Sequence, residues 1–166
     1  MHASSDSGRG HVDPRRPDDP SYGFRSKVRL SLEAFIDDVQ EGERGVLSFV
    51  HGSALVHVLP AGSGERGMIT LVCITNEDVP ASTSLDRYVA DWAERITFGA
   101  PTVIRASDRH ANIAMRWTMI AGHIDNRDLE DAVNLFAGEC EKVRADVRAT
   151  FGGSAVVASS SRFRRR

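Results

Sequence analysis

Histidine and cysteine are the residue types in this chain that could carry acid–base, nucleophilic or metal chemistry. The sequence has 166 residues, with six histidines and two cysteines. No pair of them has the i, i+4 helical spacing or the Cys/His spacing of a metal site, so we expect no metal. The histidines are better explained as surface or capping residues: His2, His11, His51, His57, His110 and His123.

Cys73 and His57 are the pair that could form a nucleophile with its base, if they faced each other across neighbouring strands. Both lie in apolar runs that the core needs, so we favour a structural role for each. Cys73 lies in a strand-like run and Cys140 on a helix-like stripe. This pattern favours two buried thiols, and it leaves open a disulfide between them.

Two further segments resemble ligand sites only superficially. The loop GSGERG (62–67) lacks the Lys-Ser/Thr ending of a phosphate loop and precedes an apolar strand, so we interpret it as a hairpin loop. The acids Glu77, Asp78 and Asp86 lack the ligand spacing of a calcium loop. The sequence therefore predicts no catalytic residues and no cofactor, which favours a protein that is not an enzyme.

Composition and charge narrow the class of protein further. Apolar residues make up 41% and charged residues 27%, which allows a packed core. No apolar run is long enough for a membrane span and no signal-peptide core is present, so we expect a cytoplasmic protein. Residues 29–153 carry a net charge of −7, which disfavours a nucleic-acid binder. The tail RFRRR (162–166) could contact nucleic acid or anionic lipid, keep the chain soluble, or fold back onto the acidic body.

Hydrophobic periodicity predicts one α+β domain at residues 29–152, between a disordered leader (1–28) and a flexible basic tail (153–166). Short turns between the strands favour an antiparallel, five-stranded sheet with three helices in the order α-β-β-β-α-β-β-α. The expected helices are 30–41, 83–98 and 125–150, and the expected strands are 46–50, 54–59, 68–75, 102–106 and 111–120.

Large apolar side chains are the best candidates for contact with a partner. In the strand 111–120, Met115, Trp117 and Met119 point to one side, and methionine and tryptophan adapt well to partner surfaces. These three residues, with Trp92 and Phe136, are our candidates for a partner-binding surface. A role in the core alone is the interpretation that the pattern favours.

The helix SLDRYVADWAERITFGAP, the hairpin TVIRASDRHANIAMRWTMI and the helix NRDLEDAVNLFAGECEKV follow one another in this order. With the element order, they make residues 31–151 resemble the type III secretion chaperone-like fold, including the YbjN family of bacterial proteins. The resemblance implies a homodimer without a cofactor that holds a segment of a client protein, in secretion or regulation. The alternative is a ligand-binding or enzymatic domain with a pocket between sheet and helices, lined by Trp92, Trp117, Phe136 and Met115.

Overall fold

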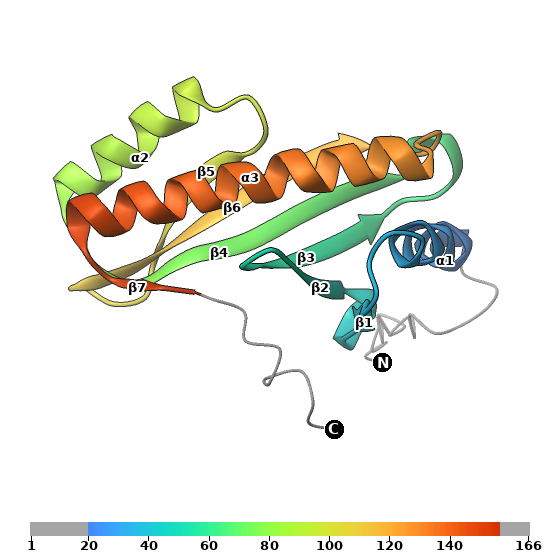
Figure 1. Cartoon of the computed structure of the whole chain (residues 1–166), viewed down its shortest axis with the longest axis horizontal. Helices are drawn as coiled ribbons and strands as arrows, with labels where there is room; N and C mark the ends of the chain where they lie inside the picture. Colours follow the sequence, from blue (N-terminus) through green and yellow to red (C-terminus); the bar gives the residue numbers. More distant parts are fainter. Residues whose placement is uncertain (1–19, 157–166) are drawn as a thin grey trace, which may run out of the picture.

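The structure, a computed structural model, describes residues 20–156 (Figure 1). One antiparallel sheet has the strand order β1-β2-β3-β4-β6-β5, and β7 pairs with β4 outside this path. The helices are α1 (Pro20–Glu33), α2 (Thr83–Arg95) and α3 (Asn126–Phe151). The strands are β1 (Gln40–Glu41), β2 (Leu47–His51), β3 (Ala54–Ala61), β4 (Met68–Pro80), β5 (Ala100–Arg105), β6 (His110–Ile120) and β7 (Ser154–Ala155).

The predicted α+β class, the three helices and the antiparallel sheet are confirmed. The predicted count of five strands is wrong, because β1 and β7 add two short strands to the five long ones. A strand of two residues has no alternating pattern that could reveal it in a sequence. Over residues 20–156, no helix combines the length and the apolar character needed to cross a membrane.

The first helix begins earlier than predicted. The expected helix 30–41 is wrong: α1 ends at Glu33, and its first turns lie in the segment expected to be a leader. Phe24, Val28 and Leu32, at i, i+4 and i+8, place one face of α1 in the core. The remainder of the expected leader (1–19) lies outside the described residues. Residues 157–166 of the expected tail also lie outside the described residues. Its earlier residues Ser154 and Ala155 form β7.

Helix α3 covers the length of the sheet (Figure 1). The predicted stripe is confirmed, because its members are all buried: Leu129, Val133, Phe136, Cys140, Val143 and Val147. Asp125 caps the helix by accepting a hydrogen bond from the Asp128 N–H (2.8 Å). Gly152 follows the last helical residue with φ of 79°, a conformation that favours glycine. These caps and the stripe fix α3 against the sheet.

Strand β4 continues through residues 76–80, beyond the end of the expected strand 68–75. Its pairing with β6 is irregular between Ile74 and Asn76 and again between Asn76 and Val79. The buried Asn76 side chain donates a hydrogen bond to the Arg144 carbonyl of α3 (3.1 Å). The polar residues therefore extend the central strand because α3 supplies a hydrogen-bond partner for one of them.

Candidate protein-binding surface

All three helices pack on one face of the sheet. Residues of α1, α2 and α3 share a single hydrophobic core with the inward side chains of the strands. Tyr88 and Trp92 of α2 both donate hydrogen bonds to Asp146 of α3, the latter over 3.0 Å. Helices α2 and α3 therefore lie on the same side of the sheet. All three described helices contribute to the core on this side, which leaves the other side without a described helix.

We call this second side of the sheet the open face. Its side chains alternate along each strand with the core residues. We define it over the regularly paired part of the sheet, which on β4 ends at Ile74, before the irregular segment that holds the exposed Glu77. More than half of the side chains of this part are apolar, and Arg116 is the only one among them with a formal charge. The open face consists of Ser48, Val50, Leu55, His57, Leu59, Met68, Thr70, Val72, Ile74, Thr102, Ile104, Asn112, Ala114, Arg116, Thr118 and Ile120.

The strand register shows how this face is built. Ser48, His57, Val72 and Arg116 form one row across four strands. Ser48 Oγ and His57 Nδ1 share a hydrogen bond of 2.8 Å, and the hydroxyls of a threonine pair on β4 and β6 share another of 3.0 Å. Burial lowers the pKa of His57, so its imidazole is neutral at pH 7. Arg116 is therefore the only charged side chain of the open face at neutral pH.

Four large apolar side chains of the open face are exposed: Leu59, Met68, Ile104 and Ile120. Ile104 is 45% exposed and Ile120 is 77% exposed, while Val72 on the central strand is half-buried. Charged residues make up 27% of the chain, yet this face holds a single one. An extended apolar surface with so few charges is typical of an interaction site.

Strand β5 adds backbone groups to this surface. It pairs with β6 along one side, and no other described strand pairs with its outer side. An unpaired edge offers N–H and C=O groups to an additional strand, although Pro101 has no N–H to donate. Arg105 at the end of β5 forms an ion pair with Asp86 of α2, which fixes this end of the edge.

The structure places the five expected partner-binding residues on the covered side. Met115 and Phe136 are wholly buried, so neither is accessible to a partner. Trp92, Trp117 and Met119 are partly buried and pack against the core. Sequence alternation correctly separated the two sides of β6, but the helices cover the side with the large residues. The absence of charge at alternate positions of several strands was the signal that could have identified the open face.

The nucleophile–base pair does not form. His57 pairs with Val72 and belongs to the open face, whereas Cys73 points into the core. Cys73 and Cys140 are free, buried thiols, as the favoured interpretation predicted. The neighbouring Cys73 thiol and burial raise the pKa of the Cys140 thiol. Among residues 20–156, no group of three or more potential ligands could hold a metal.

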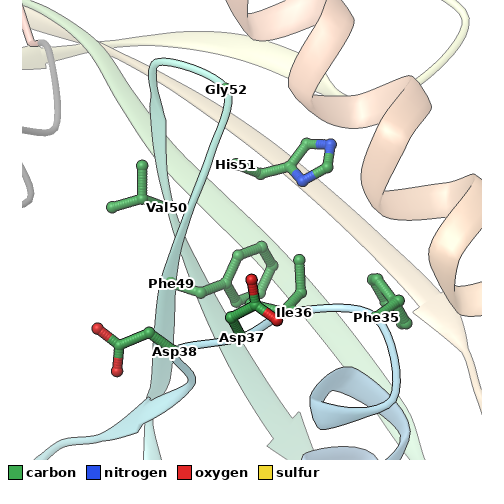
Figure 2. Close-up of a pocket in the computed structure, with 8 residues that line it drawn as sticks. All are labelled: Phe35, Ile36, Asp37, Asp38, Phe49, Val50, His51 and Gly52. Atoms are coloured by element: carbon green, nitrogen blue, oxygen red, sulfur yellow. The ribbon is translucent and has the colours of Figure 1, made fainter.

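A separate pocket lies at the outer edge of β2 (Figure 2). We call it the β2-edge pocket; its volume is about 330 Å³. It is lined by Phe35, Ile36, Asp37, Asp38, Phe49, Val50, His51 and Gly52. The pocket expected between sheet and helices would need Met115 and Phe136 to line it, and both are packed within the core.

No protein-family model matches this chain, and no curated protein matches its sequence.

Proposed function

We propose that this protein is a non-enzymatic, chaperone-like binding module that holds a segment of a partner protein. The observation that carries the proposal is the open face: an accessible, largely apolar sheet surface with Arg116 as its single charge. Apolar area removed from water on binding contributes about 25 cal/mol per Å², so this face can supply most of the affinity. Soluble monomers rarely expose a large contiguous apolar patch that has no binding role.

An extended partner segment fits this surface best. The segment adds a strand along β5 through backbone hydrogen bonds and lays alternate side chains over the open face. Thr102 and Ile104 of β5 belong to the open face, so the side chains on the same face of an added strand lie beside them. Arg116 lies in register with Ala100 at the start of β5, which favours a carboxylate in the partner at that end.

The resemblance to secretion chaperones supports two further parts of this proposal. The long elements follow the order helix, three strands, helix, two strands, helix, which is the order on which that resemblance rests. We accordingly infer a cytoplasmic homodimer whose client is a protein of secretion or regulation. Sedimentation equilibrium tests the dimer directly, because a strict monomer at micromolar concentrations contradicts it.

A matched pair of substitutions tests the role of the open face. Ile104 on this face and Leu135 on the outer side of α3 are both 45% exposed, so a lysine at either position keeps its charge in water. Ile104→Lys places a second positive charge in the contact, and we expect at least a tenfold loss of partner binding, about 1.4 kcal/mol. Leu135→Lys should bind as the unmodified protein does.

The measurement uses immobilised full-length protein and an extract of the organism that encodes the chain. Proteins retained by the unmodified chain are identified and quantified by mass spectrometry, and the same extract is passed over both variants. A partner that is lost with Ile104→Lys and kept with Leu135→Lys supports the proposal. Equal retention by both variants, at equal thermal stability, contradicts a binding role of the open face.

A further inference from the structure

The β2-edge pocket combines an apolar floor with acidic residues. Phe49 and Ile36 are core residues, and Phe35 is half-buried beside them. Figure 2 shows the Asp37 side chain on the same side of β2 as Phe49, and the Asp38 side chain on the other side. The pocket can therefore receive an apolar ring between two carboxylates.

This part of β2 also has a free edge. Strand β1 pairs only with Leu47 and Ser48, so the outer side of residues 49–51 has no strand partner among the described residues. Asp38 accepts a hydrogen bond from Gln40 (3.3 Å), and neither Asp37 nor Asp38 forms an ion pair within residues 20–156. Both carboxylates can thus accept hydrogen bonds from a cationic ligand.

The described chain ends close to this pocket. The Val156 N–H donates a hydrogen bond to the Thr75 carbonyl (3.2 Å). The Arg144 Nε donates to the same carbonyl (3.4 Å), and the Arg144 Nη1 donates to Ser53 Oγ. The Arg144 guanidinium therefore connects Thr75 of β4, whose carbonyl also binds Val156, with the turn between β2 and β3. Residues 51 and 52 of that turn line the pocket.

A third carboxylate lies at the turn between β2 and β3. Glu141 of α3 accepts hydrogen bonds from Ser53 N–H (3.3 Å) and Ser53 Oγ (3.0 Å) at the tip of the turn. Seven residues beyond Val156, the sequence reaches Phe163, which four arginines flank as RFRRR. Seven extended residues span up to about 25 Å. Residues 49–52, at the end of β2 and in the turn, extend over about 13 Å, roughly half of that length.

We propose that the β2-edge pocket binds the C-terminal segment 162–166 of the same chain. Phe163 lies on the floor formed by Phe35 and Phe49, and the arginines bind Asp37 and Asp38. The segment carries a net charge of +4 and residues 29–153 carry −7, so the two are complementary. Arginine suits this role because its planar donors match a carboxylate in two-point contacts. The bound tail then occupies the free edge of β2 that a foreign strand would otherwise use.

Paramagnetic NMR on the full-length chain tests this proposal. A nitroxide on Ser160→Cys leaves RFRRR intact, and Cys73 and Cys140 are wholly buried from the labelling reagent. The double variant Asp37→Asn/Asp38→Asn removes two carboxylates from the pocket. Glu130→Gln/Asp131→Asn removes two adjacent, exposed carboxylates from α3 and is the matched control. The readout is the broadening of the amide signals of residues 36–38 and 49–51.

We expect strong broadening at these residues in the labelled protein and in the α3 control. The pocket variant should lower the docking equilibrium about five-fold, as the loss of two exposed ion pairs implies. Equal broadening in the pocket variant and the α3 control overturns the proposal. A mixture of unlabelled ¹⁵N protein and nitroxide-labelled ¹⁴N protein separates the source of the tail. Broadening in that mixture shows that a second copy supplies the tail, which also overturns docking within one chain.

Discussion

Asp146 is the residue whose removal most directly tests how α2 is held. Its Oδ2 accepts a hydrogen bond from the Tyr88 hydroxyl and another from the Trp92 Nε1 (3.0 Å). Only Leu85 and Val89 of α2 are fully buried, so these two hydrogen bonds form a large part of its attachment to α3. We predict that Asp146→Ala loosens α2 locally while the sheet stays folded.

The size of the effect follows from these two contacts. A hydrogen bond to a charged group contributes about 1.5–3 kcal/mol when buried, and this carboxylate is only half-buried. We therefore take about 1 kcal/mol for each, or about 2 kcal/mol together. That value corresponds to about a 30-fold increase in the local opening equilibrium of α2. Tyr88→Phe removes one of the two hydrogen bonds and should give about a five-fold increase.

Native-state amide exchange of residues 83–95 measures this opening. Asp131→Ala is the control, because Asp131 is an exposed carboxylate on the same helix. We expect faster exchange in α2 with Asp146→Ala and unchanged exchange in β4 and β6. If α2 exchanges equally fast in both alanine variants, or if the whole chain loosens together, the Asp146 contacts do not attach α2.

Two further predictions concern stability. Gly122→Ala should lower the unfolding free energy by about 1–3 kcal/mol, because its Cβ would lie 2.5 Å from the backbone of Glu65. Gly138→Ala has open space around it in α3 and should raise the unfolding free energy by about 0.5–1 kcal/mol. Urea unfolding of both variants measures the two changes, and equal changes would contradict the prediction. Burial lowers the pKa of His57 in the folded state, so the contribution of this residue to stability is complete above about pH 6.5, the pKa in the unfolded chain. The contribution is lost as the pH falls through the lower pKa of the folded state. The unmodified chain should therefore lose more stability than His57→Gln between pH 7.5 and pH 5, and parallel losses in urea unfolding would count against it.

The long elements were predictable because each has a strong local pattern. The stripe of α3 and the alternation of β6 both appear in the structure near the expected bounds. Helix α1 escaped prediction because three widely spaced apolar residues, Phe24, Val28 and Leu32, are its main buried positions, in a segment rich in polar residues. Such a helix is stabilised by tertiary packing rather than by its own sequence.

The candidate site was less predictable than the fold. Alternation separates two sides of a strand, but it does not tell which side the helices cover. Residue size suggested the side of Trp117, and the structure leaves the side of Val72 and Ile74 open instead. The β2-edge pocket forms because residues 35–38 lie near β2, and its proposed occupant depends on β7 lying near the turn at Ser53. Both are contacts between distant segments of the chain, which no local sequence pattern can predict.

The central pair of strands has a consequence for biosynthesis. Met68 of β4 pairs with Ile120 of β6, and α2 and β5 lie between them in the chain. Because these partners are roughly fifty residues apart, a ribosome adding about 5–20 residues per second needs several seconds to supply β6 after β4. During that interval the nascent chain can form the β2–β4 meander, but one long edge of β4 lacks its neighbour. The newly made protein is therefore most prone to aggregation before residue 120 has left the ribosome.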